Sequence, residues 1–560
     1  MKIMSIDLWF YTKKYNIYII FFLIFCLRLY GIDYGFPFFL VSDEEEVVVS
    51  ALKMLQLKSI IPILNPVQMD MLIYPPFLPI ITLFGILPCV LFLYIKSGFP
   101  EMIQFRDICL DNIEVLYLGA RIVNICFNLL ILYLIYKICR LLFNSKRIAT
   151  LSVIFLATDF TFNFTGHFVR HWNLSTLLIW ITIFFSFKMF YSNRFRNYLY
   201  PSISGGVGFG VSYVFGGAGF LFFTILHFIK YKIHNIKKIV FSLTIFVLFA
   251  FTSILIHPYP LLRLIENKEN NVTALYVNKN FLDTIFFYLE NLFFINPILL
   301  LLTFLSIIYC CCKKIYITQI FIFSSIIIMF IILLHLTVHS EVRYLMPIIP
   351  SLVIISSIGL NEILKKKKYL FQISIITFLL IYPFISSIYS SFLLSQNDTR
   401  IQALNWIKTN APSNAKIANG MKNINLTGAQ DRYKTDDSYS EGNLIGIKKN
   451  KLKEKFLFTN ISKKFVDTNH NLNLLESLIT NQYDYVLISY KYKHNKHYRL
   501  SKKFYKGLNN KFILVQKIES SFSDVSVPDL QSTERFKFPI YKIFSFKSFG
   551  PTVEIYKLKS

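Results

Sequence analysis

Apolar segments long enough to cross a bilayer as helices recur along this chain as far as residue 392. A spanning helix needs about 20 apolar residues, and inside lipid it must satisfy all of its backbone hydrogen bonds internally. The 560-residue sequence is 54% hydrophobic, which excludes an ordinary soluble globule. We therefore predict an all-α polytopic membrane protein with about 11–13 transmembrane helices. The apolar segments lie near 15–31, 113–137, 148–166, 173–191, 201–229, 239–256, 285–311, 316–338, 344–363 and 369–391.

Clusters of Lys and Arg lie between these segments and predict their orientation. Basic loops of membrane proteins are mostly cytoplasmic. The clusters lie at 137–147, 194–196, 230–238, 313–314 and 365–368. If all of them are cytoplasmic, the glycine-rich stretch 201–229 has to cross twice as a hairpin. For the same reason we expect 77–95 to be re-entrant, or to be paired with a second short membrane segment.

The residues after 394 have a different pattern from the apolar segments before them. Short strand-like runs, such as 483–490 and 512–518, follow a helical stretch from Arg400 to Thr409. We predict two domains: a transmembrane domain over 1–394 and a small extracytoplasmic α/β domain over 395–560. Net charge is +27, but no nucleic-acid-binding module is recognisable, so a nucleic-acid partner is not expected.

An acidic run, Ser42-Asp43-Glu44-Glu45-Glu46, follows the first apolar segment. Ionised carboxylates are costly in lipid, so the run must lie at the membrane surface or in a polar cavity. One interpretation is a solvated helix start, in which Ser42 and Glu45 form a capping box. The other is that one of the acids is a catalytic base. The apolar stripe that follows, with Lys53 opposite it, predicts an amphipathic helix on the membrane surface.

Several polar residues lie at predicted membrane boundaries on the side opposite to the basic loops. Arg121, in a membrane helix, needs an anionic partner, which can be a structural carboxylate or a substrate. His167 and Arg170 are suited to binding a phosphate or a sugar, or they belong to an interfacial belt with Trp172. Arg343 and Tyr344 begin a spanning segment, where the arginine can bind a lipid phosphate or extend to the headgroups.

The sequence does not predict a metal site with a full set of ligands. His257 opens a large polar loop, and His335 and His339 have helical i, i+4 spacing, but neither has a recognisable set of further ligands. The sequence contains no phosphate-binding loop, serine-hydrolase or zincin motif. ATP hydrolysis, serine hydrolysis and zincin chemistry therefore have no support.

The order of these motifs resembles that of a known superfamily. The motifs are Asp43-Glu44, Asn65-Pro66, Tyr74-Pro75-Pro76, Ala120-Arg121, His167-Phe168-Val169-Arg170, Arg343-Tyr344-Leu345-Met346-Pro347 and Ala403-Leu404-Asn405-Trp406-Ile407. The chain, over about residues 8–410, is similar to the GT-C superfamily of polyprenyl-phosphate-sugar-dependent glycosyltransferases. The similarity is greatest to the branch containing bacterial protein O-mannosyltransferases and lipid A aminoarabinose transferases.

The resemblance implies a polytopic helical core with amphipathic surface helices in the first outer loop. It also implies transfer of a sugar from a polyprenyl-phosphate carrier to an extracytoplasmic acceptor at the cell membrane. Asp43 matches the acid that acts as base, and Glu44 matches an adjacent acid of variable role. The implied substrate-binding residues are Tyr74, Arg121, His167, Arg170, Arg343 and Tyr344.

The chain departs from the aminoarabinose transferases at their metal site. Those enzymes carry a metal-binding acid just before Pro-Pro, where this chain has Leu72, Ile73 and Tyr74. His257 is the remaining candidate ligand, so no cofactor is certain and a divalent metal stays possible. The expected partners are a polyprenyl-phosphate-linked sugar, membrane lipids and an acceptor. The alternative function is a polytopic transporter or a flippase for lipid-linked saccharides, which would be expected to have inverted repeats.

Overall fold

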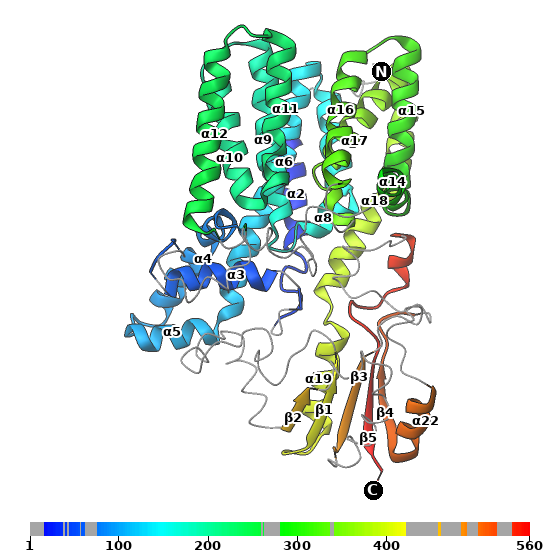
Figure 1. The fold of residues 1–560 in the computed structure, drawn as a ribbon. Coiled ribbons are helices and arrows are strands. Elements are labelled where there is room, and N and C mark those ends of the chain that lie inside the picture. The colour runs from blue at the N-terminus through cyan, green and yellow to red at the C-terminus, as the bar shows by residue number, and fades with distance from the viewer. Residues whose placement is uncertain are drawn as a thin grey trace.

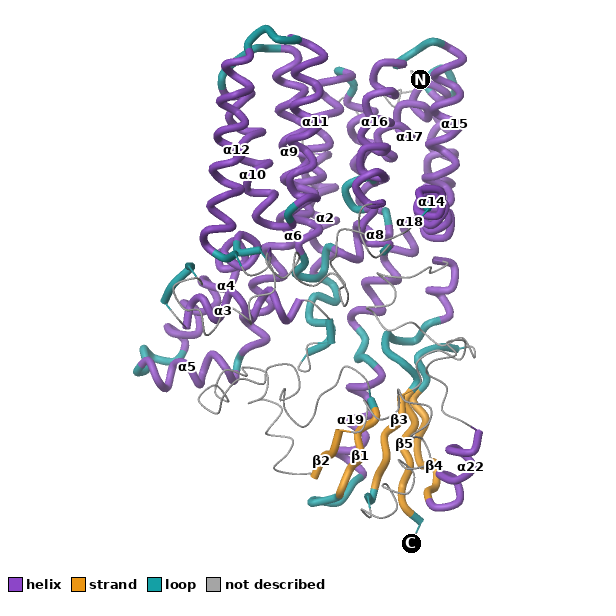
Figure 2. Tube along the Cα trace, in the orientation of Figure 1, coloured by secondary structure: helices purple, strands orange, loops and turns teal. Residues whose placement is uncertain are grey.

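The computed structural model describes residues 16–36, 40–41, 44–56, 58–61, 75–258, 261, 280–335, 341–421, 457–460, 483–489, 502–522 and 540–559. Two predicted site residues, Asp43 and Tyr74, lie outside the described residues, as does Ser42 of the predicted capping box. The described chain forms a helical bundle with a small β-sheet beyond one end of it (Figures 1 and 2). We call that end of the bundle the domain end.

Long helices run alongside one another through the bundle (Figure 1). They are α2 (Asn16–Leu29), α6 (Ile113–Phe143), α7 (Lys146–Thr158), α9 (His171–Tyr191), α10 (Arg196–Ser212), α11 (Val214–Tyr231), α12 (Ile236–Ile256), α15 (Pro297–Lys313), α16 (Ile317–His335), α17 (Ile349–Leu364) and α18 (Tyr369–Ser395). The short α8 (Phe160–Thr165) and α14 (Phe281–Ile295) lie near the domain end.

Length and composition single out six candidate membrane spans in the described part of the chain. They are α4 (Phe77–Lys96), α6, α9, α12, α16 and the α18 segment. A seventh span results if α14 and α15 count as one, and three shorter apolar helices overlap α2, α11 and α17. The multi-span helical fold is therefore confirmed. The 11–13 helices predicted from the sequence include shorter segments of this kind.

The predicted glycine hairpin is present. The stretch 201–229 folds into α10 and α11, which meet at Tyr213, where φ is 46°. A Cβ atom on Gly208 would lie only 2.3 Å from the backbone oxygen of Gly216. Small residues allow helix backbones to approach this closely in a membrane. Glycine at these two positions therefore brings α10 and α11 into backbone contact.

The segment 285–311, predicted as one span, is instead two helices. α14 ends at Ile295 and α15 begins at Pro297, and their axes differ by 115°. The Asn296 side chain accepts a hydrogen bond from the backbone N–H of Leu299 and so caps α15. Proline is favoured in the first turn of a helix, where its missing N–H is not needed. The apolar run continues across this cap, so hydropathy does not reveal the bend.

Three helices lie together beyond the domain end of the bundle: α3 (Glu44–Gln56), α4 and α5 (Met102–Asp111) (Figure 1). The apolar face of α3, including Val48 and Ala51, is buried in one cluster with Ile86 of α4 and Tyr117 of α6. The amphipathic character of α3 was predicted, but its apolar face packs against protein. Lys53, expected on the polar face, is also buried.

The small C-terminal sheet has the strand order β2-β1-β3-β5-β4. Its strands are β1 (Lys416–Gly420), β2 (Leu457–Asn460), β3 (Tyr485–Ser489), β4 (Phe512–Ile518) and β5 (Val553–Leu558). β1 pairs in parallel with β2 and β3, whereas β5 pairs antiparallel with β3 and β4. The helices α19 (Thr399–Asn410) and α22 (Lys502–Lys511) accompany the sheet, and the 3₁₀ helix η8 (Ile540–Ser545) contacts α18. The α/β character predicted for this region is confirmed.

A buried polar junction joins the bundle to the sheet. The Tyr34 hydroxyl, just after α2, donates to Asp398 Oδ2 at 2.6 Å. The same carboxylate accepts from the Arg400 side chain at 2.8 and 2.9 Å, and Thr399 donates to the carbonyl of Pro551. Asp398 and Arg400 have no exposed surface, so the ion pair fixes the start of α19 against both parts of the protein.

Candidate functional site

The connection between α8 and α9, residues 166–170, is the centre of the candidate site at the domain end. Buried asparagines from the neighbouring helices hold it. Asn124 of α6 donates to the carbonyl of Gly166 at 3.1 Å, and Asn173 of α9 donates to that of Thr165 at 2.8 Å. Buried amides left without partners are costly, so these contacts specify one position for the turn. Hydropathy does not reveal this polar network.

Glu44 and Arg121 form a bidentate ion pair beside this turn. Arg121 Nε donates to Glu44 Oε1 at 2.8 Å, and Arg121 Nη2 donates to Glu44 Oε2 at 2.5 Å. The backbone N–H of Val169 donates to Glu44 Oε1 at 2.9 Å. The exposed fractions of the two side chains are 1% and 0%. The pair therefore ties α3 to α6 and to the turn before α9.

The remaining contacts of Arg121 are also internal. Its Nη1 donates to the carbonyls of Ile32 and Tyr34, after α2. The guanidinium also lies over two aromatic rings, with its Cζ 4.6 Å from the ring centroid of Phe36 and 5.5 Å from that of Phe168. Of the two interpretations of Arg121, this geometry favours the structural ion pair. Glu44 is likewise held in place, with both of its oxygens accepting hydrogen bonds.

On the other side of the turn, aromatic contacts bring the segment that begins at Arg343 close to α9. The Trp172 ring centroid is 4.6 Å from that of Tyr344 and 4.3 Å from that of His171. Arg343 Nε donates to Glu341 Oε2 at 2.6 Å, and both side chains are 7% exposed. Arg170 is 3% exposed. The turn thus has the Glu44–Arg121 pair on one side and the aromatic cluster next to Arg343 on the other.

His167 faces away from this arrangement, into the protein. Its Nδ1 lies 3.0 Å from the carbonyl oxygen of Asn163, and its Nε2 lies 3.4 Å from the Ser391 hydroxyl of α18. The ring has no exposed surface. Burial, reinforced by the nearby positive charge of Arg28, lowers the pKa of His167 to about 4 from its usual 6.5. The substrate-binding role of His167 stays a prediction, and the described geometry directs its ring into the protein.

The neutral imidazole of His167 predicts a stability change with pH. The folded pKa is below the unfolded pKa, so the unfolded chain binds more protons between pH 6.5 and about 4. The contribution of the neutral ring to the free energy of unfolding is about 3 kcal/mol. It is fully present above pH 6.5 and is lost progressively as the pH falls to about 4. We expect His167→Gln to reduce the slope of stability against pH in that window. Thermal unfolding of the wild type and the variant at a series of pH values measures this slope. Equal slopes would contradict the lowered pKa of His167.

His257 lies directly after α12, with its side chain buried. In the described part of the chain there is no group of three or more His, Cys, Asp or Glu side chains that could hold a metal ion. His335 donates to or accepts from Thr284 at 3.2 Å, and His339 lies outside the described residues. The described residues therefore do not fit a metal, and we derive no step of the reaction through one.

The sequence patterns did not predict that two basic residues, Arg28 and Lys53, are buried. Arg28 of α2 is fully buried, and its guanidinium carbon is 5.5 Å from the ring centroid of Phe162. An arginine near the end of an apolar helix was the available signal. Lys53 of α3 is 5% exposed, and burial lowers its pKa to about 8. Its helical position suggested a solvated face, because the packing of α4 and α6 against α3 is not visible in sequence.

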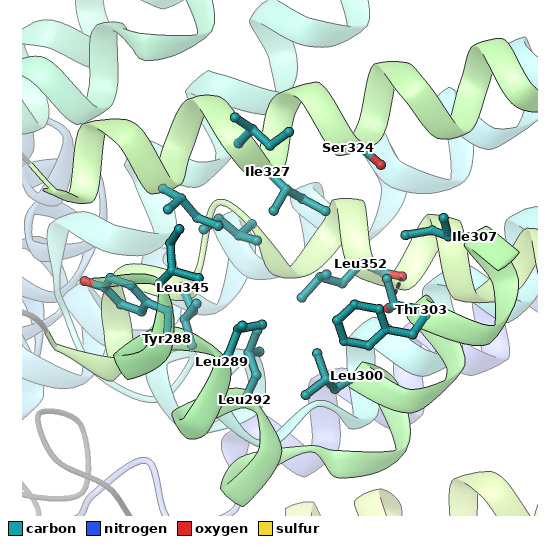
Figure 3. A pocket seen from close by; sticks show the side chains of 15 residues that line it. Tyr288, Leu289, Leu292, Leu300, Thr303, Ile307, Ser324, Ile327, Leu345 and Leu352 are labelled. Carbon is teal, nitrogen blue, oxygen red and sulfur yellow. Dashed lines mark hydrogen bonds between the residues drawn. The ribbon is translucent and has the colours of Figure 1, made fainter. Parts of the chain in front are cut away.

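An apolar cavity of about 160 Å³ lies among α14, α15, α16 and α17 (Figure 3). Aliphatic and aromatic side chains dominate its lining, with Leu345 at one part of the wall. Leu345 follows Arg343 and Tyr344 directly in the chain. The bend between α14 and α15 is what places Leu292 and Leu300 on the same cavity.

The described segment from α6 to the end of α12 coincides with a known sequence family. Residues 113–257 match the model of the family described as dolichyl-phosphate-mannose-protein mannosyltransferase. No curated protein matches the sequence.

Solved structures with a similar arrangement include ArnT from Cupriavidus metallidurans in the apo state. It has 10% identity and a TM-score of 0.47, and the match covers 90% of this chain and 97% of that one. ArnT from the same organism bound to undecaprenyl phosphate has 11% identity and a TM-score of 0.45, with 97% and 98% covered. The arabinofuranosyltransferase AftD from Mycobacteria has 11% identity and a TM-score of 0.38, with 85% and 36% covered.

The match over residues 113–257 contains several of the residues that hold the site together, including Arg121, Asn124 and Trp172. It confirms the family resemblance read from the order of the motifs. Over residues 113–257, the chain is therefore similar to the dolichyl-phosphate-mannose-protein mannosyltransferases.

Proposed function

We propose that the protein is an integral-membrane glycosyltransferase that moves a sugar from a polyprenyl-phosphate carrier to an extracytoplasmic acceptor. One observation supports this most strongly. Three residues from motifs far apart in the sequence lie around the turn 166–170 and the first turn of α9 at the domain end: Glu44, Arg121 and Tyr344. Their assembly at one membrane boundary suits a substrate whose tail stays in lipid and whose phosphate lies at the surface.

The distribution of basic residues supports the proposed orientation. The loops at the end of the bundle opposite the domain end follow α6, α9, α11, α15 and α17, and Lys or Arg lies in each of them or, after α6, in the flanking helix turns. Loops of this kind are cytoplasmic in most membrane proteins. The domain end, with the candidate site and the C-terminal sheet, is then extracytoplasmic, and the membrane is the cell membrane.

The proposed reaction needs a base and an anion-binding group. The acceptor hydroxyl or amine attacks the anomeric carbon of the sugar, and the bond from that carbon to the carrier phosphate oxygen breaks. The carrier phosphate leaves with the bonding electrons, and the acceptor proton passes to a carboxylate, for which we propose Asp43. Arg343 and Arg170 are the proposed partners of the phosphate charge. Tyr74 and Tyr344 are the proposed contacts to the donor.

Glu44 and Arg121 have a supporting role in this proposal. The carboxylate of Glu44 is occupied by Arg121 and Val169, so it is poorly placed to accept a proton from an acceptor. Asp43 precedes Glu44 directly in the chain. Fixing Glu44 therefore restricts where the adjacent acid can lie, which is how a positioning residue contributes to catalysis.

The apolar cavity is a suitable place for the first part of the carrier tail. Its lining is almost wholly apolar, and its wall residue Leu345 is two positions from Arg343. A carrier with its phosphate near Arg343 could therefore extend its isoprenoid chain among α14, α15 and α16. An isoprenoid has no hydrogen-bonding groups, so burial of apolar area supplies the binding free energy.

The proposal is tested with the full chain reconstituted in liposomes and a panel of polyprenyl-phosphate-linked hexoses and pentoses carrying a labelled sugar. We expect release of free polyprenyl phosphate and labelling of an acceptor fraction from the cell envelope. The alternative function, a flippase, predicts a different result, since a flippase would move an intact lipid-linked saccharide across the bilayer. Donors that stay intact throughout the panel while crossing the membrane would overturn the proposal.

A further inference from the structure

The 3₁₀ helix η8 carries an exposed aromatic face at an unusual place for a surface segment. In a 3₁₀ helix, side chains three residues apart lie on the same face. Ile540 and Ile543 are buried in a hydrophobic cluster with residues of β1, β3 and β5, whereas Tyr541 and Phe544 are 61% and 37% exposed. The hydrophobic core of the C-terminal domain therefore accounts for one face of η8 and leaves the other without an explanation.

Phe544, the less exposed residue of this face, contacts the membrane-spanning helix α18. The ring centroid of Phe544 is 5.3 Å from that of Tyr389 and 6.4 Å from that of Tyr382. The Tyr389 hydroxyl donates to the carbonyl of Phe546 at 2.7 Å. In Figure 1, η8 is the red helical turn drawn between the bundle and the sheet, beside α18.

Positions along α18 indicate how deep in the bilayer the contact between η8 and α18 lies. α18 begins at Tyr369, directly after the lysines at 365–368. At about 1.5 Å per residue, Tyr382 is about 20 Å and Tyr389 about 30 Å along the helix. The hydrocarbon core of a bilayer is about 30 Å thick. η8 is therefore level with the outer boundary of the hydrocarbon.

Further exposed apolar and aromatic side chains lie close to η8. α18 keeps an exposed apolar stripe as far as Ile388 and Phe392, which are 40% and 38% exposed. Next to η8, Phe522 is 70% exposed and its backbone N–H donates to the carbonyl of Ser545. The Lys547 ammonium lies 4.9 Å from the centroid of the Phe522 ring. Aromatic rings with adjacent lysines are typical of the membrane interface, where the rings enter the headgroup layer and the amines meet lipid phosphates.

We infer that η8 and Phe522 anchor the C-terminal domain in the membrane leaflet from which α18 emerges, with Tyr541, Phe544 and Phe522 inserted at headgroup level. The partner is the phospholipid surface itself, with Lys542 and Lys547 directed to its phosphates. The inference rests on the membrane-spanning bundle and does not depend on the proposed reaction. Together with the Tyr34–Asp398 junction, the anchor would give the domain a second attachment point and a fixed height above the site.

The test adds a tryptophan at the anchor of the full chain. Tyr541→Trp is reconstituted in liposomes of phosphatidylcholine and phosphatidylglycerol, with and without lipids brominated on the acyl chain. The wild-type signal from its four tryptophans is subtracted. We expect the emission of the added tryptophan to fall about twofold with brominated lipid, because an interfacial ring reaches the upper acyl chain.

Ile513→Trp is the matched control in the same domain. Ile513 is 53% exposed and pairs with Lys557 near the C-terminal end of β5, which Figure 1 draws away from the bundle. Its emission should not respond to brominated lipid. If Tyr541→Trp does not fold, Phe522→Trp takes its place with the same expected quenching.

Two outcomes would overturn the inference. If the tryptophan at position 541 emits at the same wavelength as the Ile513→Trp control and is not quenched, η8 lies in water. A blue-shifted emission without quenching by brominated lipid would mean that a protein surface, such as a second copy of this chain, covers the patch.

Discussion

Replacing Arg121 by methionine is expected to lower the free energy of unfolding by about 3–5 kcal/mol, because it leaves a carboxylate buried without its counter-ion. Glu44 is 1% exposed and, among the described residues, would keep the hydrogen bond from Val169 alone. The carbonyls of Ile32 and Tyr34 would lose their donor as well. The loss should appear as a lower unfolding midpoint in detergent or liposomes and as faster hydrogen exchange in α3.

A double-mutant cycle isolates the interaction energy between Arg121 and Glu44 from the effects of their other contacts. Glu44→Gln retains an acceptor for Val169 and removes the buried charge. The double variant Arg121→Met/Glu44→Gln should therefore be more stable than the sum of the single losses implies, by about 1–3 kcal/mol. A wild-type midpoint for Arg121→Met together with weakened donor binding would instead support the substrate-binding role first predicted for Arg121.

The chain offers an exposed pair as a control. Arg106 Nε lies 3.4 Å from Asp107 Oδ1, and the two side chains are 51% and 63% exposed. Exposed pairs contribute little, because water and salt screen them. Arg106→Met should change stability by less than about 0.5 kcal/mol. The contrast with Arg121→Met measures what burial adds to an ion pair in this protein.

Hydropathy and charge predicted most of the bundle, because a helix in lipid must be both apolar and long enough. The hairpin of α10 and α11 followed from the two basic loops around it and from glycines such as Gly208. The bend at Asn296 was missed because apolar residues continue on both sides of it. β1 was missed because its sequence, Lys416-Ile-Ala-Asn-Gly420, has a single β-branched residue and no aromatic one, whereas β3 and β4 are rich in such residues.

The candidate site was less predictable than the fold. Sequence identified Arg121 as needing an anionic partner but could not identify Glu44, which is 77 residues away. It placed His167 with the substrate-binding residues, whereas the ring is directed toward Asn163 and Ser391. Side-chain direction depends on how α8 packs against α18, and a motif gives only the residue type. The asparagines that hold the turn carried no signal for the same reason.

Replacing Asp43 by asparagine is expected to lower the rate of sugar transfer by about 10²–10⁴-fold. Asparagine has nearly the same shape as aspartate but does not accept a proton at neutral pH, so the acceptor would lose its base. Binding of polyprenyl phosphate should be retained, because the proposed phosphate contacts come from Arg343 and Arg170. Single-turnover transfer measures the rate, and titration with the unglycosylated carrier measures the binding.

Variants of neighbouring acids make the assignment specific to Asp43. Glu46→Gln removes a charge from the same run and should keep the wild-type rate within about threefold, since it is assigned no role in proton transfer. Glu44→Gln should lower stability more than Asp43→Asn does, because Glu44 is the residue bound by Arg121 and Val169. Asp43→Asn, in contrast, should keep the wild-type unfolding midpoint while transfer is lost. If Asp43→Asn transfers sugar at the wild-type rate and Glu44→Gln does not, the proton acceptor is Glu44, and the buried ion pair must open during the reaction.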